Sequence, residues 1–188
     1  MSELSDVVHR LERLESIEAI RKLVAMYTYA ADDRDFEVLR DMFTPDVCFR
    51  SANGATEVKG IDAVVNYYHA RFQGMKHSFH VTHDHVIDFQ SDVLASGRVS
   101  SHAEMLRDGE PHIVALRYDD IYGLDAGRWC FRQRTVSFYY YAKAADYREF
   151  MQSKLRVRAS DVPVEADWPE GTATFINYQP SKSHFDDL

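Results

Sequence analysis

Cysteine and long apolar runs are both scarce in this sequence of 188 residues. The two cysteines, Cys48 and Cys130, have apolar neighbours, so a disulfide scaffold is not expected. No apolar run approaches the roughly 20 residues that cross a bilayer, and the N-terminus mixes acidic and basic residues where a signal peptide needs an apolar core. We therefore expect a cytoplasmic protein with no membrane partner.

Positive charge is scarce as well, since 22 Lys and Arg stand against 30 Asp and Glu, for a formal net charge of −8. Phosphate backbones attract clustered Lys and Arg, so nucleic acid is not expected as a partner. The GxGxxG, P-loop, HExxH and nucleophile-elbow motifs are missing too. The sequence therefore predicts no cofactor of the common kinds and no covalent nucleophile.

Aromatic residues are plentiful, with 11 Tyr and 11 Phe, and 45% of the chain is hydrophobic. This composition supports one hydrophobic core, and the length is that of a single domain with a modest addition. We expect a domain over residues 1–144. The extension over residues 145–188 is more polar, and it is expected to be a lid, an oligomer arm or a partly disordered tail.

Three helices are expected before the long strands. Apolar residues from Val7 to Ala31 recur every three or four positions, which predicts a helix that ends near Asp32. Asp35 can cap a second short helix that stops before Pro45. A short strand follows Asp46, and helical spacing returns over residues 60–73 before Gly74.

The rest of the domain has the texture of β-structure. Four runs rich in β-branched and aromatic residues cover 77–89, 93–106, 112–124 and 128–142. Their short connections contain the Asp and Gly of tight hairpins, so neighbouring runs should pair antiparallel. The expected fold is α+β, with three N-terminal helices on a curved antiparallel sheet.

Asp32 and His80, 48 residues apart, are the candidate catalytic pair. A carboxylate beside an imidazole raises its basicity and fixes its tautomer, so such a pair can remove a proton near neutral pH. Each residue also has a plainer explanation. Asp32 can cap a helix within a charged run, and His80 can be a structural histidine of a strand.

Strand alternation complicates this pairing. It sets His80 in phase with Thr82 and Asp84, while Val81 and Ile87 share the opposite face. Either the inner face of the sheet is polar here, or a β-bulge changes the direction of part of the strand.

The segment IEAIRKLVAMYTYAADDRDFEVLRDMFTPDV resembles the N-terminal signature of the SnoaL-like family of the nuclear transport factor 2 superfamily. The resemblance extends over about residues 10–142. It implies a cone-shaped α+β barrel, also described as a cystatin-like roll, with an active site inside its mouth and often a trimeric assembly. The expected homotrimer comes from this resemblance and from apolar residues on the uncovered sheet face.

The resemblance also implies site residues. In scytalone dehydratase and bile acid 7α-dehydratase, an aspartate ends the first helix and a histidine of the following long strand partners it. Asp32 and His80 fall at those positions, and Tyr27 matches a tyrosine of the bile acid enzyme. The arginine that this enzyme carries on its last strand aligns with Ser137, and a substrate-holding tyrosine of scytalone dehydratase falls near Arg50 or Ser51. The substrate therefore does not carry over.

Further candidates follow from the cone picture and from the sequence. Arg134, which alternates with Arg132 on the last strand, can bind a substrate oxygen or a developing oxyanion, or can be a surface charge. His83 and His85 form an H-x-H pair that suits zinc or iron, but no third ligand is evident and no metal is expected. Expected pocket-lining residues are Tyr29, Phe49, Tyr67, Phe72, Tyr118, Phe138 and Tyr140.

The predicted function is a cofactor-free lyase, most readily a dehydratase acting on a small hydrophobic aromatic or polycyclic alcohol. Two other reactions need the same base. One is deformylation of an aryl-propanediol of the lignin-dimer type, and the other is isomerisation as in ketosteroid isomerase. A noncatalytic small subunit or ligand-binding module is the alternative from another class, and it has no need of the Asp32–His80 pair.

Overall fold

A computed structural model describes residues 3–160 and 162–178. Its elements are α1 (Glu3–Asp33), α2 (Phe36–Asp41), β1 (Phe43–Ser51), β2 (Glu57–Lys59), α3 (Ile61–Gln73), β3 (Met75–Phe89), β4 (Leu94–Arg107), β5 (Glu110–Asp125), β6 (Arg128–Lys143), the 3₁₀ turn η1 (Ala144–Asp146), α4 (Tyr147–Phe150) and α5 (Ala173–Ile176). The predicted α+β order is confirmed, with β2 as one short additional strand. None of the described helices is long and apolar enough to cross a membrane.

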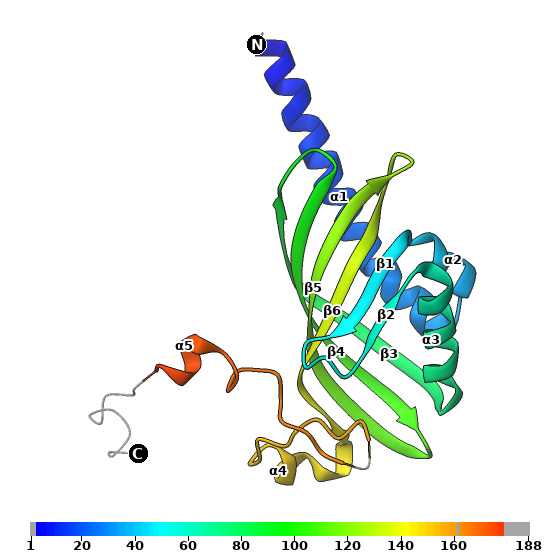
Figure 1. The fold of residues 1–188 in the computed structure, drawn as a ribbon, viewed down its shortest axis with the longest axis vertical. Helices are drawn as coiled ribbons and strands as arrows, with labels where there is room; N and C mark the ends of the chain where they lie inside the picture. The colour runs from blue at the N-terminus through cyan, green and yellow to red at the C-terminus, as the bar shows by residue number, and fades with distance from the viewer. Residues whose placement is uncertain (1–2, 161, 179–188) are drawn as a thin grey trace.

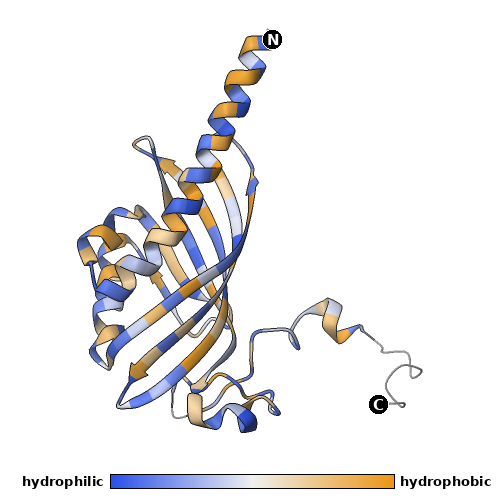
Figure 2. Cartoon of the chain, turned by 180° about the vertical axis from the view of Figure 1, so that it is seen from behind, coloured by the Kyte–Doolittle hydropathy of each residue, from blue (hydrophilic) through white to orange (hydrophobic). Residues whose placement is uncertain are grey.

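The strands form one curved, open sheet in the order β2-β1-β6-β5-β4-β3 (Figure 1). Strands β3 to β6 pair antiparallel in succession, as predicted. β1 runs parallel to β6, so the sheet is mixed, which the sequence analysis did not predict. Figure 2 shows α1 lying across one face of the sheet, with α2 and α3 beside it. The sheet and these helices enclose the main core.

Local sequence sets the ends of these elements. Asp35 caps α2 by accepting a hydrogen bond from the Val38 amide at 3.0 Å. The β5–β6 turn has positive φ at Ala126 (45°) and Gly127 (78°), the geometry of a two-residue hairpin turn that matches strand twist. These turns fix the register of the long strands.

A bulge in β3 resolves the alternation problem. Thr82 pairs with Ser101 and His85 with Val99, so three steps along β3 match two along β4. The extra residue reverses the alternation of the strand at this point. As a result His80 and His85, which strict alternation separates, are both half-buried on the inner side. Of the two explanations considered, the bulge is the one observed.

A buried ion pair occupies the centre of the core. The Arg134 guanidinium donates two hydrogen bonds to the Asp120 carboxylate, at 2.9 and 2.7 Å, and both side chains are 0% exposed. The guanidinium carbon lies 4.0–4.1 Å from the ring centres of Tyr27, Tyr118 and Phe131. Helix α1 is therefore held to β5 and β6 by a cation in contact with aromatic faces.

Hydrogen bonds continue from this pair toward β3. The Tyr122 hydroxyl donates to Asp120 Oδ2 at 3.0 Å, and His85 Nε2 lies 3.1 Å from the Tyr122 oxygen. Gly97 leaves room for the contact between His85 and Tyr122, because a Cβ at this position would lie 2.8 Å from the Tyr122 ring and 2.9 Å from His85 Nε2. The network joins side chains of β3, β5 and β6 in one polar unit.

The described part of the C-terminal extension packs against one end of the sheet. Val157 forms an isolated bridge with Tyr141 of β6, and Arg107 donates to the Ala159 carbonyl oxygen at 2.8 Å. Arg156 pairs with Glu170 through two hydrogen bonds of 2.6 and 2.7 Å. Helix α5 projects away from the body (Figure 1). The prediction for the extension also covers residues 161 and 179–188, which lie outside the described residues.

We expect Asp120→Asn to destabilise the fold by about 3–5 kcal/mol, because the variant leaves the Arg134 charge buried without a counterion. The neighbouring Asp119 offers a matched control, since its ion pair with Arg98 has a similar 2.7 Å distance but side chains that are 65% and 46% exposed. Asp119→Asn should cost at most about 1 kcal/mol. Urea unfolding measures both values, and equal losses would contradict this ranking.

Candidate active site

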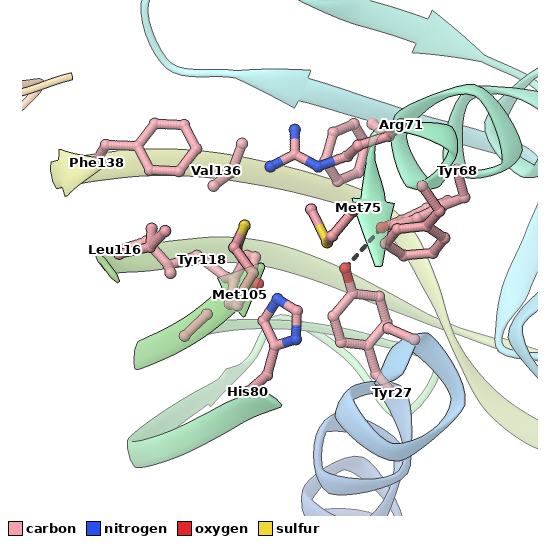
Figure 3. Close-up of a pocket in the computed structure, with 15 residues that line it drawn as sticks. Tyr27, Tyr68, Arg71, Met75, His80, Met105, Leu116, Tyr118, Val136 and Phe138 are labelled. Atoms are coloured by element: carbon pink, nitrogen blue, oxygen red, sulfur yellow. Dashed lines mark hydrogen bonds between the residues drawn. The ribbon is translucent and has the colours of Figure 1, made fainter. Parts of the chain in front are cut away.

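The main pocket lies between α1, α3 and the inner face of the sheet (Figure 3). Apolar and aromatic side chains dominate the wall, and Arg71 and His80 are its basic residues. The lining residues are Tyr27, Ala31, Phe49, Tyr68, Arg71, Phe72, Met75, His80, Ala103, Met105, Val114, Leu116, Tyr118, Val136 and Phe138.

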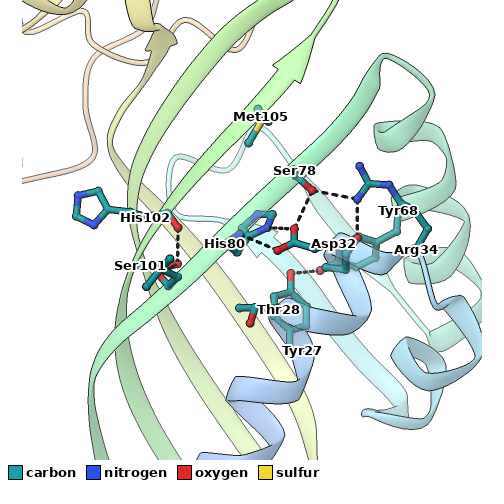
Figure 4. A network of polar contacts seen from close by, with 12 residues as sticks. Tyr27, Thr28, Asp32, Arg34, Tyr68, Ser78, His80, Ser101, His102 and Met105 are labelled. Carbon is teal, nitrogen blue, oxygen red and sulfur yellow. Dashed lines mark hydrogen bonds and ion pairs between the residues drawn. The ribbon is translucent and has the colours of Figure 1, made fainter.

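Asp32 and His80 are in direct contact beside this pocket (Figure 4). His80 Nδ1 lies 2.6 Å from Asp32 Oδ1, and the His80 backbone amide donates to Asp32 Oδ2 at 2.7 Å. Both side chains are 15% exposed. The last turn of α1 supplies the aspartate and the first half of β3 supplies the histidine, so packing of α1 against β3 sets the pair.

The carboxylate of Asp32 is held in its ionised form. Burial on its own would raise the pKa of Asp32, but hydrogen bonds and charge from His80, together with a hydrogen bond from Ser78 at 2.8 Å, lower it below its ordinary value. An ionised carboxylate only accepts hydrogen bonds, so His80 Nδ1 carries the proton. The Nε2 lone pair is then the basic atom available on the pocket side.

A further layer orients this pair. Arg34, which follows α1 with a positive φ of 61°, donates to the Ser78 hydroxyl at 3.1 Å. Its guanidinium carbon lies 3.7 Å from the centre of the Phe72 ring. Ser78 therefore accepts a hydrogen bond from Arg34 and donates one to Asp32. Through these contacts and the Phe72 ring, the end of α1 is attached to both β3 and α3.

Two tyrosine hydroxyls meet in the wall of the same pocket (Figure 3). Tyr27 and Tyr68 share a hydrogen bond of 2.6 Å, and both side chains are buried. Burial, with Tyr27 close by, raises the pKa of Tyr68 well above its ordinary value. The hydroxyl that accepts the shared bond still has its own hydrogen to donate. The pair is therefore a hydrogen-bond donor for a ligand and a poor source of a free proton.

Arg71 extends from α3 into the pocket (Figure 3). Its Nη1 donates to the Tyr67 hydroxyl at 3.3 Å. Burial on its own would lower the pKa of Arg71, but the hydroxyls of Tyr67 and Tyr141 raise it, so the guanidinium remains charged. The pocket thus contains a cation as well as the imidazole.

The structure brings six of the predicted site residues to the pocket wall and places Asp32 directly behind His80. The six are Tyr27, Phe49, Phe72, His80, Tyr118 and Phe138.

Four predicted residues lie outside the wall of this pocket. Tyr29 is 63% exposed, because it follows Tyr27 by two positions on a helix and so faces away from the pocket. Arg134 lies below the pocket with Asp120, and Tyr140 belongs to a second apolar cluster with Phe150. Tyr67 lines a neighbouring cleft and contacts the Phe49 ring.

The H-x-H pair is not a chelating pair. The bulge in β3 separates the two side chains: His83 lies on the exposed side, where its Nε2 is 2.8 Å from His102 Nδ1, and His85 is turned inward to contact Tyr122. Within residues 3–160 and 162–178, no three His, Cys, Asp or Glu side chains gather as metal ligands would.

Sequence reasoning missed Tyr68 and Arg71. Both fall on the buried stripe of α3, at four and seven residues after the buried Val64. An arginine in phase with an apolar helix face was the available signal, because a solvated arginine usually lies on the polar face.

A model of the SnoaL-like domain family matches residues 12–135. The chain belongs to this family. No curated protein matches the sequence. The matched region of the SnoaL-like domain runs from α1 into β6, and it includes Asp32, His80 and Arg71.

Solved structures share the fold at low sequence identity. A scytalone dehydratase-like protein from Novosphingobium aromaticivorans has a TM-score of 0.66 and 22% identity, over 70% of this chain and 89% of that one. A hexachlorocyclohexane dehydrochlorinase from Novosphingobium barchaimii has a TM-score of 0.67 and 19% identity, over 72% and 94%. A protein of unknown function from Mycobacterium tuberculosis has a TM-score of 0.61 and 22% identity, over 72% and 77%.

We expect the stability that Asp32 contributes to be lost in acid. Because its pKa in the folded state lies below the ordinary value, the contribution is fully present above about pH 4 and disappears as the pH falls through the folded-state pKa. The difference in Tm between the wild type and Asp32→Asn should therefore be largest above about pH 5 and shrink toward pH 3. Thermal melts at half-unit pH steps measure it.

Asp84→Asn is the matched control, since Asp84 is exposed on the same strand. Its Tm difference from the wild type should stay nearly constant over this range. A constant difference for Asp32→Asn as well would contradict the ionised hydrogen-bonded carboxylate.

Proposed function

We propose that this protein is a cofactor-independent lyase that eliminates water from a hydrophobic aromatic or polycyclic alcohol. The observation that carries the proposal is the Asp32–His80 pair, 2.6 Å apart, at the wall of a largely apolar pocket. An imidazole oriented by a carboxylate is a general base suited to neutral pH. The aromatic lining supports a flat, apolar substrate.

In the proposed reaction, His80 Nε2 removes a proton from a carbon next to the one that bears the hydroxyl. The electron pair of that C–H bond forms the double bond, and the C–O bond breaks. Asp32 stabilises the imidazolium that forms, and the imidazolium then returns its proton to the departing oxygen. The products are an alkene and water, and the enzyme recovers its starting state with no oxidant or reductant consumed.

In this reaction the Tyr27–Tyr68 pair donates a hydrogen bond to the departing oxygen, on which negative charge develops. The raised pKa of Tyr68 favours donation of a hydrogen bond over release of a proton, which is why the imidazolium is assigned the proton transfer. The names of the similar structures, a dehydratase-like protein and a dehydrochlorinase, both refer to eliminations and support this reaction class.

We expect His80→Ala to lower turnover by about 10²- to 10⁴-fold, the usual contribution of a general base. Asp32→Asn should also be severe, because an amide cannot stabilise the imidazolium. Since the two residues act as one unit, the double variant should be hardly slower than His80→Ala. Single-turnover rates on a panel of aromatic and steroidal alcohols, with no cofactor added, measure these effects.

His83→Ala provides the control, because His83 is an exposed histidine of the same strand. It should retain wild-type turnover. Full activity in either His80→Ala or Asp32→Asn would refute the dyad, and so would equal losses in the control. Chromatographic analysis of the products distinguishes water loss from release of formaldehyde or isomerisation, which use the same base.

The proposal includes a homotrimer. Apolar side chains stay exposed on the first half of α1 and on the outer face of β3, and an interface would cover them. They are Leu4, Val7, Leu11, Leu14, Phe79 and Val86.

Light scattering should give a mass of about three times the 21.8 kDa of one chain. Val86→Glu should lower this mass, whereas Glu12→Gln, an exposed change on α1, should not. A mass of one chain at micromolar concentration would contradict the trimer.

A further inference from the structure

Two arginines of the described chain are buried, and each of them has a carboxylate partner. Arg134 pairs with Asp120 at 2.9 and 2.7 Å, and Arg156 pairs with Glu170 at 2.6 and 2.7 Å. Both pairs are bidentate, the arrangement that best offsets the desolvation of a guanidinium. Each of these two buried charges is therefore neutralised by a neighbouring carboxylate.

Arg71 departs from this pattern. Over the described ranges its one hydrogen bond is to the Tyr67 hydroxyl, at 3.3 Å, and no carboxylate lies within ion-pair distance. Among the described residues, no carboxylate lines the main pocket or the second cleft that adjoins it. The remaining N–H groups of this charged fork face the pocket (Figure 3).

The position of Arg71 defines where its partner must sit. Arg71, Val136 and Phe138 line the main pocket and also a second cleft. This second cleft, which we call the outer cleft, is also lined by residues of the β1–β2 connection, by Tyr67 and Tyr141, and by four residues of the C-terminal extension, namely Val157, Ala159, Ser160 and Val164. Arg71 therefore lies at the junction of the two spaces, on the side of α3, while His80 lies on β3.

We propose that Arg71 binds an acidic oxygen of the substrate, a carboxylate or a phenol, while the reacting carbon lies at His80. This inference rests on the proposed function for the part that His80 plays. A guanidinium in a low-dielectric wall favours the ionised form of a bound acid, so the substrate class is an amphiphilic aromatic acid or phenol. The outer cleft then holds the portion of the molecule beyond the acidic group.

The test compares three probes of nearly identical shape, namely biphenyl-4-carboxylate, 4-phenylphenol and biphenyl-4-carboxamide. Isothermal titration calorimetry at neutral pH gives their affinities for the full chain. We expect the wild type to bind the carboxylate about 10- to 100-fold more tightly than the carboxamide, the range of a charge-assisted hydrogen bond. If the natural group is a phenol, bound 4-phenylphenol should show the ultraviolet band of its phenolate near neutral pH.

Arg71→Met should abolish both signatures, and Arg71→Lys, which keeps the charge but not the fork, should retain part of the carboxylate preference. Arg132→Met is the matched control, since Arg132 is a 56% exposed arginine of β6, and it should behave as the wild type. Thermal melts establish that each variant is folded. Equal affinities for carboxylate and carboxamide in the wild type, without a phenolate band, would overturn the assignment, as would a preference unchanged in Arg71→Met.

His80→Ala separates this inference from the proposed function. Retention of the carboxylate preference in His80→Ala supports Arg71 as the binding group, whereas its loss would assign the acid to the imidazole and overturn the inference. If His80→Ala keeps both full turnover and the Arg71-dependent preference, the dyad proposal fails while the acid-binding role of Arg71 stands.

Discussion

The ion pair between Arg134 and Asp120 is the interaction on which the rest of this structure depends. It is fully buried, and its charges are compensated by each other and by aromatic faces from α1, β5 and β6. Tyr27 comes to this cation from α1 and directs its hydroxyl to Tyr68 of α3. A single guanidinium thus fixes where α1 crosses the sheet. The position of α1 in turn decides whether Asp32, at its last turn, can reach His80.

The second constraint is the bulge in β3, which lets one strand meet two requirements. Before the bulge, His80 must face inward to meet Asp32, and after it, His85 and Ile87 must face inward to join the core. Regular alternation cannot satisfy both, because these positions follow His80 by an odd number of steps along the strand. The extra residue removes the conflict by turning His85 inward, while His83 stays outside in contact with His102.

Most of the fold could be predicted from local signals, and the site only in part. Helix spacing, the Asp35 cap and the Gly-containing turns depend on neighbouring residues, and those elements were predicted correctly. The parallel pairing of β1 with β6 joins segments about 85 residues apart, and no local pattern specifies it. The depth of Arg134 likewise depends on Asp120, its partner across the β5–β6 ladder. The sequence indicated that Arg134 could point inward. The pairing of β5 with β6 shows that its guanidinium is bound by Asp120.

These charge arrangements leave the pocket with few polar groups that a ligand can use. The Asp32 carboxylate is hydrogen-bonded to His80 and Ser78, and the Arg134 guanidinium is paired with Asp120 outside the pocket wall. The polar groups that line the apolar pocket are the His80 imidazole on β3, the Arg71 guanidinium on α3, and tyrosine hydroxyls between α1 and α3. In a wall of low polarity, each of these groups interacts more strongly with a ligand than it would in water. Selectivity in such a site follows from the separation of proton acceptor and cation, because a ligand must match both while its remaining surface stays apolar.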